Sequence, residues 1–149
     1  MTLSDSSSVI LLAEDDEDDY LITKMAFQKS QIRNPLHHVK NGEELMDYLR
    51  HNGRYASENP PCPILILLDL NMPKMDGREA LKAIKSDPKL KKIPVVILTT
   101  SKSEEDILLT YELGANSFIK KPTNFHDFLK ILGSLTEYWL RVVKLPHEP

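Results

Sequence analysis

Residues 62–80 read CPILILLDLNMPKMDGREA, and this stretch decides the fold. An unbroken apolar run over residues 64–68 ends at a carboxylate, Asp69. Burying an unpaired carboxylate is costly, so Asp69 either emerges into water at the end of a strand or lies beside a cation. A solid apolar run without polar alternation is typical of a parallel strand that is covered on both faces. The stretch therefore predicts a buried parallel strand with an acid at its carboxyl end.

Apolar runs and amphipathic segments alternate along the rest of the chain. We predict strands over 9–13, within 34–42, and over 64–70, 93–101 and 116–122, and helices over 16–31, 43–53, 76–88 and 103–115, with a loop over 54–63. Residues 124–145 are predicted to form one long helix or a helix plus an extension. Parallel strands joined by right-handed helical crossovers make a three-layer fold. The expected class is α/β, with a doubly wound five-stranded parallel sheet. Periodicity leaves the order of the strands in the sheet open.

Composition excludes several classes of protein. The chain has 149 residues and a formal net charge of -3, which suits one domain and carries no dense basic run for a nucleic acid. Cys62 is the single cysteine, so neither an intramolecular disulfide nor a cysteine-based zinc site is possible. Residues 1–8 are Ser-rich, are expected to be flexible, and do not resemble a signal peptide. No apolar run approaches the roughly 20 residues that span a bilayer, so we expect a cytoplasmic protein without a membrane partner.

Polar side chains follow the predicted strands at the points where the strands end. They are Glu14, Asp15 and Asp16 after the first strand, Asp69 and Asn71 after the third, Thr99 and Thr100 at the end of the fourth, and Lys120 and Lys121 after the fifth. Ligands of such sheets bind outside the carboxyl ends of the strands. Oxygen ligands with room for water suit Mg²⁺. One strand-end acid is usually only a turn former, but agreement among several strands indicates a site.

Four blocks in this order resemble the signature of a known family, the receiver domain of two-component response regulators. They are ILLAEDD (10–16), LILLDLNMPKMDG (65–77), IPVVILTTS (93–101) and FIKKP (118–122). The resemblance covers residues 9–132 and implies a (βα)5, flavodoxin-like fold. It also implies a signalling domain that assists its own phosphorylation and dephosphorylation, rather than an enzyme acting on other substrates.

The resemblance implies a role for each matching residue. Asp69 matches the phosphoryl acceptor, Lys121 and Thr99 assist the transfer, and Thr99 and Phe118 form the switch. Glu14, Asp15, Asp69 and the backbone carbonyl of Asn71 match the ligands of Mg²⁺ or Mn²⁺. The Lys121–Pro122 bond matches the family's cis peptide. Thr100 stands where many members have Ala, which implies restricted access to the phosphoryl group.

Residues 133–149 are too few for a second domain, so the output must pass through a protein partner, a phosphorelay step or self-association. Phe125, Phe128, Leu129 and Leu132 are expected to form the buried stripe of the last helix. Apolar residues continue beyond that stripe and predict a homodimer interface made by Tyr138, Trp139, Leu140, Val142 and Val143. The alternative, that this tail folds back on its own domain, stays open.

Two further segments, RYASENPPCP (54–63) and EYWLRVVKLP (137–146), resemble the small response regulators that are partnered with cyanobacterial and bacterial phytochrome kinases. This implies a light-regulated sensor histidine kinase as the phosphoryl donor. A pseudo-receiver that never takes phosphate is the main alternative. A phosphatase with a strand-end nucleophile needs a second acid where Asn71 stands, and a flavin carrier needs a phosphate-binding loop where the first acids stand. His37 and His38 point to opposite faces of a strand and cannot chelate together.

Overall fold

Five parallel strands form the central layer of the fold. The computed structural model describes residues 8–146, and its strands are β1 (Ile10–Ala13), β2 (Leu36–Val39), β3 (Leu65–Leu68), β4 (Val95–Thr99) and β5 (Ser117–Lys120). They lie in the order β2-β1-β3-β4-β5, and each neighbouring pair is parallel. The predicted doubly wound α/β class is confirmed. The order reverses between β1 and β3, which is where such sheets place their ligands.

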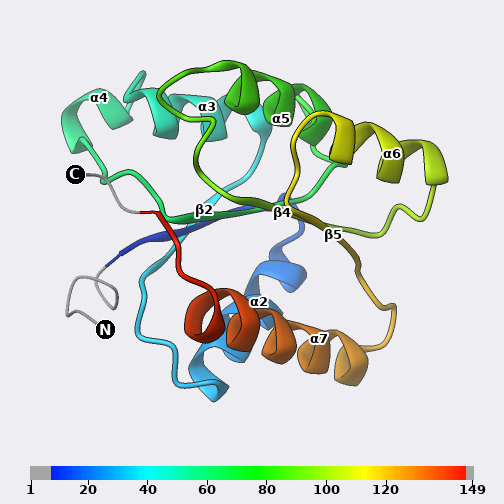
Figure 1. The fold of residues 1–149 in the computed structure, drawn as a ribbon. Coiled ribbons are helices and arrows are strands. Elements are labelled where there is room, and N and C mark those ends of the chain that lie inside the picture. The colour runs from blue at the N-terminus through cyan, green and yellow to red at the C-terminus, as the bar shows by residue number, and fades with distance from the viewer. Residues whose placement is uncertain (1–7, 147–149) are drawn as a thin grey trace.

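Helices cover both faces of the sheet (Figure 1). On one face lie α3 (Gly42–Arg50), α5 (Gly77–Ser86) and α6 (Glu104–Glu112), and on the other lie α2 (Glu17–Lys29) and α7 (Phe125–Glu137). Each of these helices begins after a polar residue whose side chain accepts a backbone N–H of the first turn. These N-caps are Asp16, Asn41, Asp76, Ser103 and Asn124.

The segment 54–63, predicted as a loop, contains one helical turn, α4 (Tyr55–Glu58). The turn has no side-chain cap. Tyr55 is buried, and its ring packs edge-to-face against Tyr48 of α3 with 5.1 Å between the ring centroids. Burial of one aromatic ring, which no local sequence pattern signals, holds this turn.

Two separate cores lie on the two faces of the sheet, and neighbouring strand residues contribute to opposite cores. Leu11 packs toward α3 and α5, whereas Leu12 packs toward α2 and α7. The two histidines of β2 follow the same rule. His37 Nδ1 lies 2.6 Å from the hydroxyl of Tyr48, while the His38 ring stacks on Tyr20 of α2. The expectation that the two imidazoles point apart is confirmed.

Of the two forms expected over 124–145, one long helix or a helix plus an extension, the structure shows a helix, α7, with an extension. The helix ends at Glu137 and continues as a π-helical turn, η1 (Tyr138–Val142). Its buried face is Phe128, Leu132 and Leu135, spaced i, i+4, i+7. Phe125 was expected in this stripe but is 52% exposed in the first turn. The stripe is therefore shifted toward the C-terminus, because Leu135 reaches the sheet and Phe125 does not.

The tail after α7 is divided between core and solvent. Trp139 and Leu140 pack partly against the core shared by α2 and α7, so this part of the tail folds back on its own domain. Tyr138 and Val142 are 54% and 65% exposed. The expected flexible N-terminus, residues 1–8, lies outside the described residues except for Ser8, and so do tail residues 147–149. Across positions 8–146, no helix has both the length and the apolar character that a membrane crossing requires.

Gly77 lets the start of α5 lie against the end of β3. A Cβ atom at Gly77 would lie 2.3 Å from the carbonyl oxygen of Asp69 and 2.6 Å from the Cα of Leu70. The Gly77 N–H also donates to the Leu70 carbonyl at 2.9 Å. The absence of a side chain at this one position therefore fixes the loop that follows Asp69.

We expect Gly77→Ala to lower the free energy of unfolding by about 2–3 kcal/mol, because the added carbon overpacks fixed backbone atoms. Gly133→Ala is the matched control, because a Cβ at Gly133 in α7 meets no atom within 4 Å. That change should stabilise the protein by about 0.5–1 kcal/mol. Urea unfolding measures both. Equal effects of the two substitutions would contradict the close approach at Gly77.

Candidate functional site

Backbone hydrogen bonds place three of the expected site residues one position beyond the ends of β1, β3 and β5. The Glu14 N–H donates to the Val39 carbonyl at 2.9 Å, and the Asp69 N–H donates to the Ala13 carbonyl at 3.1 Å. The Lys121 N–H donates to the Thr99 carbonyl at 2.7 Å. Glu14, Asp69 and Lys121 therefore lie on one rim of the sheet, beside the point where the strand order reverses.

The side chains of these residues form a buried ionic cluster. Lys121 Nζ lies 2.5 Å from Glu14 Oε1, 2.8 Å from Asp19 Oδ2 and 3.3 Å from Asp69 Oδ2. Lys121 is 3% exposed and Glu14 is 2% exposed. Charges that are so deeply buried persist only when they are paired. The cation that Asp69 requires at the end of its apolar strand is, in the described chain, the ammonium of Lys121.

Burial and pairing act against each other in this cluster. Burial raises the pKa of Glu14 to about 8, against the attraction of Lys121. Burial also opposes the charge on Lys121, but the carboxylates of Glu14 and Asp69 outweigh it and raise the pKa of Lys121. Lys121 therefore remains charged at neutral pH, whereas the raised pKa of Glu14 lies close to neutral pH.

The acids also form a candidate site for a divalent metal ion. One carboxylate oxygen from each of Glu14, Asp15 and Asp69 can lie within 4.8 Å of the other two. Asp15 is exposed, and the cleft above the acids, about 560 Å³ in volume, is open to water. An all-oxygen donor set with free solvent positions fits Mg²⁺ or Mn²⁺. Asn71 lies beside this set, and its N–H donates to Asp69 Oδ1 at 3.2 Å. The expected role of its carbonyl as a ligand stays a prediction.

Asp19 belongs to the cluster but was not predicted. It lies in the first turn of α2, and its carboxylate accepts from Lys121 Nζ. The acidic run EDDEDD over residues 14–19 carries the signal, because a helix that begins after Asp16 turns its third residue back toward the strand end. Unless the N-cap at Asp16 is known, the sequence alone does not show which of the six acids faces the strand ends.

The expected switch residues lie at different depths. Thr99 is fully buried, and within residues 8–146 its hydroxyl oxygen has only long contacts, 3.4 Å from the Ser101 N–H and 3.5 Å from Asn71 Nδ2. Phe118 is partly buried against the core beneath α3 and α5. Thr100 is exposed and lines the cleft above the acids. Both contacts are at the long limit of a hydrogen bond, and in both the Thr99 oxygen is the acceptor.

The expected cis peptide bond is not present. Among residues 8–146 every peptide bond is trans, including Lys121–Pro122. The trans form is the intrinsically preferred isomer of a bond before proline. In this conformation Lys121 Nζ already contacts three carboxylates, so the lysine does not need the cis isomer to reach them.

The fold and the rim of acids with one lysine define the class of this protein. A family model for the response regulator receiver domain matches residues 10–133, and the chain belongs to this family. The receiver domain is a module of signalling proteins. The resemblance that the four sequence blocks indicated is confirmed.

The chain is similar in sequence and in structure to particular response regulators. It is 44% identical over 147 residues to response regulator Rcp1 of Synechocystis sp., with 97% of this chain and 99% of the relative covered. The crystal structure of the Mn²⁺-bound form of Rcp1 matches with a TM-score of 0.90 over 94% of this chain and 99% of that one. The phosphorylated cyanobacterial phytochrome response regulator RcpA matches at 44% identity, with a TM-score of 0.90 over 95% and 99% of the two chains.

Binding of Mn²⁺ is expected to strengthen roughly 70-fold between about pH 6 and pH 8.5, because a metal ligand must be deprotonated. Glu14, whose pKa is raised to about 8, carries a proton at the lower pH and loses it across this range. Titration of free Mn²⁺ by electron paramagnetic resonance at several pH values measures the change. Glu14→Gln is the control and should bind more weakly with a flat pH profile. An equally steep profile in Glu14→Gln would assign the proton to another group.

Proposed function

We propose that this protein is a single-domain response regulator that accepts a phosphoryl group on Asp69 from a sensor histidine kinase. The observation that supports the proposal most strongly is the carboxylate of Asp69, which lies between two further acids and the ammonium of Lys121. A nucleophile, a set of metal ligands and a fixed cation at one strand end are the parts that phosphoryl transfer needs.

The chemistry needs no general base, because the nucleophile is a carboxylate oxygen and has no proton to lose in the reaction. An oxygen of Asp69 bonds to phosphorus as the bond from phosphorus to the donor's imidazole nitrogen breaks. The electron pair of that bond goes to the nitrogen. Because the other ring nitrogen of the donor histidine carries a proton, the leaving group is a neutral imidazole. Lys121 neutralises charge on the transferring oxygens. Mg²⁺ or Mn²⁺ held by Glu14, Asp15, Asp69 and the Asn71 carbonyl would supply further positive charge.

The phosphoryl group adds about −1.5 to −2 charge and three strong acceptor oxygens beside Thr99. In this proposal the Thr99 hydroxyl leaves its long contacts and donates to the phosphoryl group. Phe118 then follows into the space that Thr99 vacates, and the surface of α6, β5 and α7 changes shape. The change is a shift between two packings of the same elements.

The proposed phosphoryl donor is a light-regulated kinase of the phytochrome type. The proposal is supported by the similarity to RcpA, a cyanobacterial phytochrome response regulator, which extends over nearly the whole length of both chains. Such a kinase presents its phosphohistidine in the cytoplasm, and we place this protein there.

The experiment that tests the proposed chemistry is the intact mass of the protein after incubation with acetyl phosphate and Mg²⁺. We expect the gain of one phosphoryl group, its absence when EDTA replaces Mg²⁺, and its removal by hydroxylamine, which cleaves acyl phosphates. If acetyl phosphate fails, a phosphorylated histidine kinase of the phytochrome type is the second donor. Failure with both donors would leave a binding scaffold that never takes phosphate.

We further propose that the protein forms a homodimer through the C-terminal helix and tail, with Tyr138, Val142 and Val143 at the interface and the solvent-facing parts of the partly buried Trp139 and Leu140 beside them. Exposed Tyr138 and Val142 support this, as does an apolar cleft of about 500 Å³ between β5 and α7 that Tyr138 and Trp139 line. Light scattering with size exclusion should give a dimer mass for the wild type and a monomer mass for Val142→Asp. A monomeric wild type, both with and without the phosphoryl group, would contradict the proposal.

A further inference from the structure

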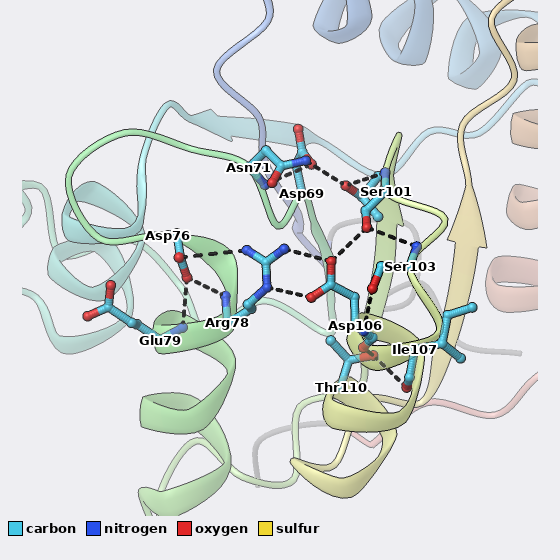
Figure 2. Close-up of polar contacts among 11 residues, drawn as sticks. Asp69, Asn71, Asp76, Arg78, Glu79, Ser101, Ser103, Asp106, Ile107 and Thr110 are labelled. Carbon is cyan, nitrogen blue, oxygen red and sulfur yellow. Dashed lines mark hydrogen bonds and ion pairs between the residues drawn. The ribbon is translucent and has the colours of Figure 1, made fainter.

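An ionic bridge joins the starts of α5 and α6, outside the cluster of acids around Lys121. The guanidinium of Arg78 donates two parallel hydrogen bonds to the carboxylate of Asp106, each 2.7 Å long. Figure 2 shows Arg78 between Asp76 and Asp106, with Asp106 also facing Ser101. The Ser101 hydroxyl donates to Asp106 Oδ2 at 2.6 Å. Bidentate, charge-assisted contacts of this kind are among the stronger and more directional ones in proteins.

Arg78 lies in the first turn of α5, which is held in place by hydrogen bonds and close packing. The carboxylate of Asp76 accepts the backbone N–H groups of Arg78 and Glu79 at 2.8 and 3.1 Å and so caps α5. Gly77 holds the same turn against the backbone of Asp69 and Leu70. The arginine therefore reaches α6 from the segment that follows the phosphoryl acceptor. The side chains of both bridge residues are partly buried, which limits screening by solvent.

Asp106, in contrast, holds a loop. Residues 100–103 connect β4 to α6, and Asp106 is tied to two of them: it accepts the Ser101 hydroxyl, and its own N–H donates to the Ser103 hydroxyl at 3.3 Å. The N–H of Ser101 in turn reaches the Thr99 hydroxyl at 3.4 Å. Hydrogen bonds from Arg78 and Ser101 lower the pKa of Asp106 to about 2, so the bridge stays ionised at neutral pH. A continuous set of contacts thus runs from α5 to Thr99.

We propose that Arg78, Asp106 and Ser101 are positioning residues that hold the loop 100–103 in its resting place and restrain Thr99 from bonding a phosphoryl group on Asp69. The inference rests on the proposed function and assigns a regulatory role to residues that neither bind metal nor touch the acceptor. The Thr99 oxygen accepts the Ser101 N–H, so moving the hydroxyl toward the phosphoryl group stretches this contact unless the loop moves with it. The bridge therefore favours the resting state, and only the minor, rearranged state is ready to react.

The direction of the effect follows from population arithmetic. Reaction from a minor state is slowed by the fraction of molecules in that state, so weakening the bridge raises the observed rate. We expect Asp106→Asn and Arg78→Lys each to increase the rate of phosphoryl uptake from acetyl phosphate by roughly fivefold, within the usual range of coupling between sites. Lys keeps the positive charge but loses the bidentate geometry. The double variant should be no faster than the faster single variant, because both changes remove one interaction.

The matched control is Arg50→Lys. Arg50 pairs with Asp87 at the opposite end of α5, at 3.6 Å. The Arg50→Lys substitution should change neither the rate of phosphoryl uptake nor the hydrogen exchange of the loop 100–103. A second readout does not need phosphate at all: amide hydrogen exchange at residues 101–103 should accelerate in Asp106→Asn and in the milder Ser101→Ala. Mn²⁺ affinity of Arg78→Lys should stay within twofold of the wild type, which a general loss of structure would not allow.

Three results would overturn the inference: rates within twofold of the wild type with unchanged exchange, slower uptake in both single variants, or single effects that multiply in the double variant. Failure of the proposed function looks different. There the wild type takes up no phosphoryl group from either donor, and the hydrogen exchange of the loop alone decides whether the bridge restrains it.

Discussion

Replacing Asp69 by Asn is expected to abolish phosphoryl uptake, with a loss of at least about 10³-fold, as for removal of a catalytic nucleophile. The amide has nearly the same shape but no anionic oxygen to attack phosphorus. The fold should survive, because Lys121 keeps its contacts with Glu14 and Asp19. Any remaining mass gain in this variant would therefore report a second acceptor and not partial activity of the first.

Intact mass after incubation with acetyl phosphate and Mg²⁺ measures the change. Asp18→Asn is the control, because Asp18 is an exposed acid of the same acidic run. It should gain one phosphoryl group at the wild-type rate. A full gain in Asp69→Asn would place the acceptor elsewhere and would contradict the site proposed here.

Removing the ammonium of Lys121 should have the second largest effect, and it acts on both stability and chemistry. Lys121→Met leaves Glu14 buried with no opposite charge beside it. Removing one partner of a buried ion pair costs about 3–5 kcal/mol of the free energy of unfolding. Phosphoryl uptake should also fall by roughly 10²-fold, as when a positioned electrostatic donor is removed from a site.

The stability loss should depend on pH in a defined direction. Without Lys121, the folded-state pKa of Glu14 stays raised above its ordinary value of 4.5, because burial remains and the main opposing charge is gone. A folded-state pKa above the unfolded one favours folding at low pH and costs stability as the pH rises. We therefore expect a larger deficit at pH 8 than at pH 5.5.

Urea unfolding at the two pH values measures this deficit, and intact mass measures phosphoryl uptake. Lys120→Met, which removes the exposed neighbouring ammonium, is the control and should change neither quantity appreciably. Equal deficits at both pH values would show that Glu14 is not the group left unpaired. Wild-type uptake in Lys121→Met would remove the lysine from the proposed chemistry.

Local pattern was enough to predict the layers of this fold and the rim of the site. Solid apolar runs indicated parallel strands, because strands covered on both faces need no polar alternation. Because parallel strands all end at the same edge, Glu14, Asp69 and Lys121 could be assigned to one place before any distance was known. The resemblance of four ordered blocks then named the family, which the match over residues 10–133 confirms.

Tertiary structure decided what depends on contacts between distant segments. The order β2-β1-β3-β4-β5, the turn held by Tyr55 and the exposure of Phe125 follow from packing that no single segment encodes. The prediction of a cis peptide bond before Pro122 was wrong, because the isomer depends on all the groups that surround Lys121 and Pro122 in the folded chain.

The bridge between Arg78 and Asp106 makes the same point. These residues are 28 positions apart, and each alone reads as a solvated charge of a first helical turn. Sequence by itself determined which residue types stand at the strand ends, because strand and helix periods are local. Only the folded chain decided which charges meet, because pairing energy depends on distance and burial in three dimensions.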